Sequence, residues 1–335
     1  MAATLAPDAV LHSALAPIFA CTDTGKVCLV SGSRMFGIFP NFAGTPKEVN
    51  PGFHKLMDIA RIMRSFQHVI LTVLCIFMLS TCRHSSAKNE SQTLTIATYN
   101  VGVFGKSGTN TTQMIASMMK ELGVQVLSMN ELDSCTLRHP EYQLKEFADA
   151  MGGWNYNFAP AMSYQGGKYG IGTVSDPGLE VTGKHNLTLP KGDGSEQRAL
   201  AVTVFEDFVF CSTHLDHHSA DAQLEQAKLI SAWAELFYGD SDKPVFLCGD
   251  MNAYPDSETI KLLKRDWTIL SPLEFTFSAK NPQKCIDYIM VYKNASGKVK
   301  VNGSGIASKF TSGDVAVASD HLPVYVEVAL PISDK

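Results

Sequence analysis

A run of alternating β-rich and helical segments, starting at Thr93, constrains the fold of this 335-residue chain more than any other feature. Strand-like runs outnumber helical ones, and two of them, 199–205 and 208–213, are joined directly by a tight turn at Glu206-Asp207. A doubly wound parallel sheet would need a crossover between its strands. We therefore expect an α/β (α+β) fold in one domain, residues 93–332. The expected architecture is a four-layer sandwich of two packed mixed β-sheets flanked by helices.

The clearest helical pattern lies at 220–237. Its apolar residues recur near one face of a helix, which predicts that this face packs on a sheet. These residues are Leu224, Ala227, Leu229, Ile230, Trp233 and Phe237. Shorter helices are expected at 111–122, 144–151 and 257–264.

Residues 63–82 resemble an export signal. A short basic opening from Met63 precedes an apolar run at 69–79, which is too short to span a bilayer as a helix. Leu79-Ser80-Thr81-Cys82 resembles a bacterial lipobox, although Thr81 stands where Gly or Ala is usual, and residues 83–92 form a polar tether. The pattern predicts an exported protein, either secreted or held at the bacterial cell envelope by a lipid anchor at Cys82.

Sixty-two residues precede this signal, although such signals normally begin a chain. One explanation is that Met63 is the true start, so that 1–62 are a non-native or disordered extension. The other is that 1–62 are a genuine segment and 69–79 a buried helix. Repeated Gly and Pro between Gly25 and Pro51 interrupt any regular element and favour the first explanation. N-terminal sequencing of protein from membranes distinguishes the two.

The charge of the chain gives no support to a general nucleic-acid binder. Residues 93–335 hold 20 Lys and Arg against 28 Asp and Glu, a formal charge of −8, whereas such a binder needs a basic surface. The net charge does not exclude a local basic groove. The four cysteines of this part form no C-x-x-C pair, and Cys211 and Cys248 end apolar runs, which predicts buried strand residues rather than a zinc site.

Polar residues recur where apolar strands end. Strand ends on one side of a sheet meet at a crevice in which ligands bind. Carboxylate and amide oxygens suit a hard divalent cation such as Mg²⁺ or Mn²⁺. The strand-end residues are Asn100, Glu131, His214, Asp250, Asn252, Asp320 and His321, and Asp287 lies inside a further apolar run.

The order of these motifs resembles the endonuclease/exonuclease/phosphatase superfamily, which has the deoxyribonuclease I-like fold. The resemblance spans about 94–330, and Asn130 departs from it because the family usually has Gln at this place. The most specific part is Gly-Asp-x-Asn followed about 70 residues later by Ser-Asp-His. The motifs are Thr98-Tyr99-Asn100-Val101, Asn130-Glu131-Leu132-Asp133, Tyr169-Gly170-Ile171-Gly172, Gln197-Arg198-Ala199, Thr213-His214-Leu215-Asp216-His217, Gly249-Asp250-Met251-Asn252, Ile286-Asp287-Tyr288-Ile289 and Ser319-Asp320-His321.

The resemblance implies a metal-dependent phosphoesterase that uses Mg²⁺ or Mn²⁺. Its implied substrate is a phosphate ester of a phospholipid head group, a sugar or inositol, or a nucleic acid, and no protein partner is inferred. The implied metal ligands are Asn100, Glu131 and Asp320. The implied catalytic residues are Asp250 as base, Asn252 as positioning group, the Asp287–His321 pair, and His214 as acid, with Arg198 and Asn252 on the phosphate.

Two other functions compete with this one. Thr213-His214-Leu215-Asp216-His217-His218 partly matches the signature of metallo-β-lactamase-like hydrolases, which would need zinc. A catalytically inactive surface binding module of the same fold is the other alternative. A degenerate module should have lost some of the polar positions, and all of them are present.

Several residues have a plainer interpretation as well. Arg198 starts a strand, where a surface ion pair is as common as a phosphate contact. Asp133 and His217 are either site residues or supporting ones. Trp154, Tyr164 and Tyr169 are either part of a substrate groove or ordinary core aromatics.

Overall fold

The computed structural model describes residues 93–106 and 108–330. The signal-like segment 63–82, with Cys82, and the residues before it lie outside this part. Within the described ranges, none of the helices combines the length and apolar character needed to cross a membrane.

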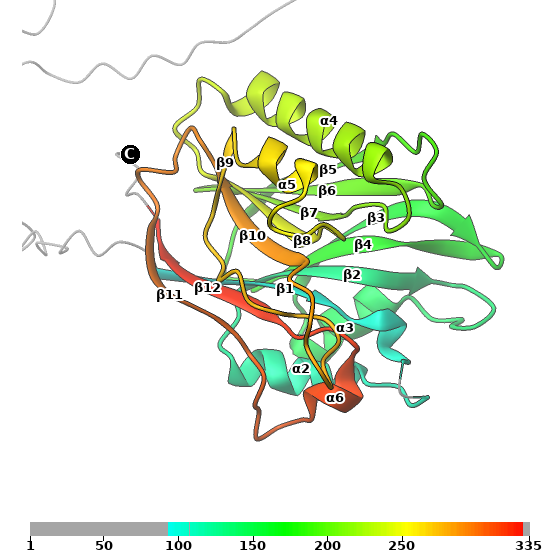
Figure 1. Ribbon diagram of the computed structural model, residues 1–335. Coiled ribbons are helices and arrows are strands. Elements are labelled where there is room, and N and C mark those ends of the chain that lie inside the picture. Colours follow the sequence, from blue (N-terminus) through cyan, green and yellow to red (C-terminus); the bar gives the residue numbers. More distant parts are fainter. Residues whose placement is uncertain (1–92, 107, 331–335) are drawn as a thin grey trace, which may run out of the picture. The chain divides into compact units, whose positions relative to one another are not determined.

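Two six-stranded mixed sheets form the centre of the described chain (Figure 1). The first has the order β11-β12-β1-β2-β4-β3 and the second β5-β6-β7-β8-β10-β9. The strands of the first sheet are β1 (Thr93–Asn100), β2 (Val126–Ser134), β3 (Asn155–Tyr164), β4 (Gly167–Ser175), β11 (Lys300–Ile306) and β12 (Val324–Ala329). Those of the second are β5 (Val181–Leu189), β6 (Arg198–Phe205), β7 (Val209–His214), β8 (Val245–Asp250), β9 (Trp267–Ile269) and β10 (Asp287–Tyr292).

Helices cover the outer face of each sheet, as Figure 1 shows, so the predicted four-layer sandwich is confirmed. α2 (Thr112–Glu121) and α3 (Gln143–Met151) pack on the first sheet. α4 (Ala220–Tyr238) and α5 (Glu258–Leu263) pack on the second. The short helices η1 (Gly102–Phe104) and α6 (Val315–Ala318) lie on the loops beside β1 and β12.

Alternating side chains of each central strand divide the core into layers. In β1, Leu94 and Ile96 enter the layer between the sheets, whereas Ala97 and Tyr99 face the helices. A strand buried on both faces in this way reads as a continuous apolar run. Polar side chains at the ends of such strands can contact one another beyond the apolar core, which places the functional side chains where the strands end.

The burial of α4 differs from the prediction. Leu229 and Phe237, expected on the packed face, are 37% and 62% exposed. The buried face carries Ala227 and Ile230, as predicted, together with Ala234 and Gln226. The small residues let the helix approach the sheet closely, and Gln226 accepts a hydrogen bond from the Asp216 backbone N–H at 2.9 Å.

Candidate active site

Polar residues meet where the two parallel strand pairs end. β1 and β2 are parallel and place Asn100 opposite Asn130. β7 and β8 are also parallel and place His214 opposite Asp250, which faces Asp287 across the antiparallel β8–β10 pair. The predicted crevice therefore exists, and both sheets contribute to it.

The Asn130 amide joins the two sheets at this edge. Its Nδ2 donates to the Thr213 carbonyl at 2.8 Å, and its Oδ1 accepts from the Asp250 backbone N–H at 3.0 Å. Gly249 lies in the same contact, at φ +149°, and a Cβ on it would be 1.8 Å from the Thr213 carbonyl oxygen. The close approach of β7 and β8 therefore requires glycine at this position.

Glu131 reaches the crevice through a bulge in β2. The register with β4 shifts between Met129 and Leu132, and Glu131 has φ +58°, a left-handed conformation that is rare outside glycine. Asn100 Nδ2 lies 3.0 Å from Glu131 Oε1 and 3.2 Å from Asp250 Oδ2, so one amide donor connects both carboxylates. A backbone strained in this way is a recurrent feature of functional sites.

A lysine side chain lies between two of the predicted metal ligands. Lys106 Nζ is 3.5 Å from Glu131 Oε2 and 3.2 Å from Asp320 Oδ2. Its ammonium stands where the carboxylates converge, which shows that the pair can hold a cation. Carboxylate oxygens such as those of Glu131 and Asp320 fit Mg²⁺ or Mn²⁺. Asn100, in contrast, turns its Nδ2 toward Glu131 and its Oδ1 toward the Gly102 backbone N–H.

His321 forms a buried pair with Asp287. His321 Nδ1 lies 2.9 Å from Asp287 Oδ2, and Thr276 Oγ1 donates to the same oxygen at 2.6 Å. The Phe277 ring packs on the imidazole with a centroid distance of 4.9 Å. Burial alone would lower the pKa of His321, but the charges of Asp287 and Asp250 outweigh it and raise the pKa to about 10. The imidazole is therefore cationic at neutral pH.

Asp250 lies at the centre of this buried group. His321 Nε2 is 3.6 Å from Asp250 Oδ2, and donor atoms of Asp250, Asp287 and His321 lie within 4.8 Å of one another, close enough to hold a metal ion. Burial, followed by the charge of Asp287, raises the pKa of Asp250 to about 7. A carboxylate with a pKa near the working pH is suited to accept a proton.

Arg198 and His214 form a third group of residues around the crevice, beside the Glu131–Lys106–Asp320 group and the Asp250–Asp287–His321 group. Arg198 is 2% exposed, and its terminal nitrogens lie 3.4 Å from His214 Nδ1 and 3.0 Å from His217 Nδ1. It does pair with Glu196 at 3.2 Å, at the cavity wall, where the Arg198 side chain is 3% and the Glu196 side chain 30% exposed. Burial and the Arg198 charge hold the pKa of His214 well below its usual range. A neutral imidazole is a poor candidate for the expected acid, and its Nε2 contacts Asn252 Nδ2 at 2.9 Å instead.

The same arrangement disfavours a zinc site in this segment. The Arg198 guanidinium lies against both His214 and His217. Asp216, the carboxylate of the partial zinc signature, accepts the backbone N–H groups of His218 and Ser219, each at 2.8 Å. Its oxygens therefore order the loop.

These groups of residues enclose a cavity of about 450 Å³. It is lined by seven predicted site residues: Glu131, Arg198, His214, Asp250, Asn252, Asp320 and His321. Asn100 and Asp287 are buried behind them. Sequence reasoning missed Lys106, Glu196, Phe277 and Lys284, which also line the cavity, and Thr276, which supports Asp287. These residues lie outside the strand-end motifs, and no local sequence pattern singles them out.

Comparisons with known proteins agree with this fold. The chain matches the model of the Endonuclease/Exonuclease/phosphatase family over residues 97–322. A sequence comparison with curated proteins found no significant match. A mannosyl-6-phosphatase from Bacteroides thetaiotaomicron is structurally similar, with a TM-score of 0.59 and 21% identity over 70% of this chain and 99% of that one.

Two more distant structures share the fold. A 2′,3′-cyclic phosphatase has a TM-score of 0.55 and 12% identity over 72% of this chain and 96% of its own. The human Nocturnin catalytic domain, with a bound sulfate anion, has a TM-score of 0.55 and 14% identity over 71% and 93%.

Proposed function

Because the chain belongs to the endonuclease/exonuclease/phosphatase family, we propose that it is a metal-dependent phosphoesterase which hydrolyses its substrate by attack of water. The proposal is supported above all by one observation. A buried carboxylate of raised pKa, Asp250, lies between a cationic imidazole and an oxygen-rich group that already holds an ammonium. That combination offers a proton acceptor and two positive positions around one cavity.

Each group in the cavity has a definite task in this proposal. Asp250 accepts the proton of the attacking water. Asn252 orients that water, and its backbone N–H donates to Asp250 Oδ1 at 2.9 Å. The His321 cation, held by Asp287, faces the negative charge that develops on phosphorus. Arg198 supplies a second cation at the phosphate. His214 stays neutral and fixes the Asn252 amide.

Glu131 and Asp320 would hold the divalent cation, which when bound neutralises charge on a phosphoryl oxygen, and the predicted ligand Asn100 would position Glu131 through its Nδ2. The test is hydrolysis of phenyl phosphate, bis(p-nitrophenyl) phosphate and alkyl phosphates with Mg²⁺ or Mn²⁺. We expect turnover that chelation with EDTA abolishes and that added Mg²⁺ restores. Turnover that EDTA leaves unchanged would refute the metal requirement, and the lack of hydrolysis of every ester would refute the activity.

Lys106 should oppose metal binding when no substrate is present. Because its ammonium pairs with Glu131 and Asp320, a divalent cation must displace it. Lys106→Met is therefore expected to tighten binding of Mn²⁺ about two- to fivefold, the range for a partly exposed ion pair. Isothermal titration calorimetry measures this directly.

Lys228→Met is the matched control, because Lys228 pairs with Glu225 on the outer surface of α4 at 2.7 Å. Its affinity for Mn²⁺ should equal that of the unmodified protein. Unchanged or weaker binding by Lys106→Met would place the metal elsewhere in the cavity.

A further inference from the structure

A small cavity, which we call the lysine pocket, opens beside the catalytic cavity. It has a volume of about 200 Å³ and shares Lys106 and Asp320 with the catalytic cavity. Residues 278–280, from the chain between β9 and β10, and residues of α6 supply most of the remaining lining, and Figure 1 shows that chain running down to α6. A group attached to a phosphate in the catalytic cavity can therefore extend into the lysine pocket.

The backbone that carries Lys280 is fixed against the catalytic cavity. Lys280 lies in a short hairpin whose base is the pair Phe277 and Lys284. Beside it, the Ala279 N–H donates to the Asp320 carbonyl at 2.7 Å. Because both ends of this contact belong to the lysine pocket, the Lys280 side chain starts from a defined position at its rim.

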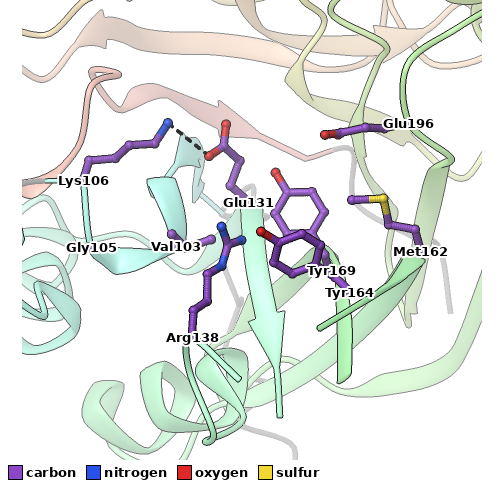
Figure 2. A pocket seen from close by; sticks show the side chains of 9 residues that line it. All are labelled: Val103, Gly105, Lys106, Glu131, Arg138, Met162, Tyr164, Tyr169 and Glu196. Carbon is purple, nitrogen blue, oxygen red and sulfur yellow. Dashed lines mark ion pairs between the residues drawn. The ribbon is translucent and has the colours of Figure 1, made fainter. Parts of the chain in front are cut away.

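The two lysines of the pocket differ in their partners. Lys106 Nζ lies 3.5 Å from Glu131 Oε2 and 3.2 Å from Asp320 Oδ2, and Figure 2 shows its side chain extended toward Glu131. Its stem lies against Gly102, where a Cβ would be 2.3 Å from Lys106 Cγ. Lys280 is exposed and has no ion-pair partner among the described residues.

The charge around Lys106 reverses when Glu131 and Asp320 hold a divalent cation. The two carboxylates and the ammonium together carry −1, and the two charges of the cation change this to +1. Lys106 is then without a carboxylate partner in a pocket that Lys280 also lines. Asp320 is the one carboxylate among the described residues that line this pocket. With that carboxylate neutralised, the pocket presents two ammonium groups, which attract an anion.

A further cavity that Lys106 lines is less suited to an anion. It has a volume of about 340 Å³, and both Glu131 and Glu196 line it (Figure 2). Its other cation, Arg138, already donates to the two oxygens of Asp133, at 2.5 and 3.0 Å. The lysine pocket is therefore the better place for a second anionic group.

We propose, on the basis of the phosphoesterase activity proposed above, that the lysine pocket binds a second anionic group of the substrate, either a carboxylate or a second phosphate. The phosphate that is hydrolysed lies in the catalytic cavity at the same time. Lys106, displaced from Glu131 and Asp320 by the divalent cation, joins Lys280 on the second group. The two lysines determine specificity in this arrangement and take no part in bond breaking.

The test is the binding of phosphonates, which contain no ester bond to hydrolyse, by isothermal titration calorimetry. Alkylphosphonates are compared with phosphonates of the same length that end in a carboxylate or in a second phosphonate. With Mg²⁺ in excess, we expect the terminal anion to tighten binding about fivefold at the best chain length, within the range for two partly exposed ion pairs. In EDTA the gain should fall to about twofold, because Lys280 alone is then available. The terminal group with the larger gain identifies the second anion of the substrate.

Substitution of each lysine gives a different expected result. Lys280→Met should remove most of the gain from the terminal anion and leave the affinity for alkylphosphonates unchanged. Lys106→Met should also reduce the gain, although it tightens binding of Mn²⁺. A variant that fails to fold would not show these two changes of opposite sign.

Lys264→Met is the matched control, since Lys264 is exposed at the end of α5 and lines neither cavity, and it should keep the full gain. No gain from a terminal anion at any chain length, or a gain that Lys280→Met leaves intact, would overturn the proposal. Equal losses of affinity for both kinds of phosphonate in Lys280→Met would place its ammonium at the catalytic phosphate and overturn it too.

The binding result is independent of hydrolysis. A gain from the terminal anion in a protein that hydrolyses no ester would leave the lysine pocket standing and refute the phosphoesterase activity. Ester hydrolysis without such a gain would refute the lysine pocket alone.

Discussion

Replacing His321 with alanine is expected to lower kcat for phosphoester hydrolysis by about a thousandfold or more. The His321 imidazole is cationic because Asp287 lies 2.9 Å from Nδ1 and Asp250 lies 3.6 Å from Nε2. Such a preorganised charge acts on the transition state at no cost of reorganisation, and single groups of this kind contribute about 10²–10³ in rate, as do general acids and bases. Steady-state kinetics with saturating Mg²⁺ measure the loss.

Stability has to be separated from catalysis in this variant. Alanine leaves the buried Asp287 carboxylate without its imidazole, which should lower the free energy of unfolding by about 3 kcal/mol. The double variant His321→Ala/Asp287→Asn removes that charge, and we expect it to regain stability but no activity. His185→Ala, at an exposed position of β5, should change neither the free energy of unfolding nor the rate of hydrolysis. Hydrolysis within tenfold of the original rate in the double variant would refute the role of His321.

The location of the site could be predicted from local sequence because its main residues end apolar strands. A strand buried on both faces is visible in the sequence as a continuous apolar run, and the polar residue that ends the run marks the end of the strand. Asn100, His214 and Asp250 follow this rule. Their meeting in space depends only on two parallel strand pairs, which the packing of mixed sheets provides.

Features that depend on distant contacts could not be predicted in this way. β11 has the sequence KVNGSGI, without apolar alternation, and exists because its backbone pairs with β12. β9 has three residues and depends in the same way on β10. Edge strands gain stability from a partner, which single-sequence periodicity does not report.

The positions of the side chains that complete the site also depend on distant contacts. Lys106 and Thr276 come from loops whose course is set by packing against the finished sheets, so their neighbours in sequence say nothing of Glu131 or Asp287.

The exposure of Leu229 and Phe237 on α4 has another cause. The face of the helix that contacts the sheet carries Ile230 beside the small residues Ala227 and Ala234, and hydrophobicity alone does not encode which face approaches closely.

Asp250→Asn should lower kcat by at least about a thousandfold, because an amide cannot accept the proton of the attacking water. The same substitution should make the metal-free protein more stable at pH 8. Burial and the Asp287 charge raise the pKa of Asp250 from 3.8 to about 7 in the folded state. The folded state therefore holds the proton more tightly than the unfolded chain, and stability falls as pH rises from about 4 to about 7.

Asparagine does not ionise, so the stability of the Asp250→Asn variant does not fall in this way as the pH rises. A shift of about three pKa units, which already includes the attraction to His321, corresponds to about 4 kcal/mol at most. An asparagine NH₂ group cannot accept one of the two hydrogen bonds that Asp250 receives from Asn100 and from the Asn252 backbone, which reduces the gain to about 1–2 kcal/mol. Urea unfolding in EDTA should show this gain at pH 8, shrinking as the pH is lowered towards 4. A variant less stable than the original protein at pH 8 would contradict the raised pKa. An inactive variant that is also more stable cannot be explained by misfolding, and it would identify Asp250 as a residue whose buried charge serves the reaction rather than the fold.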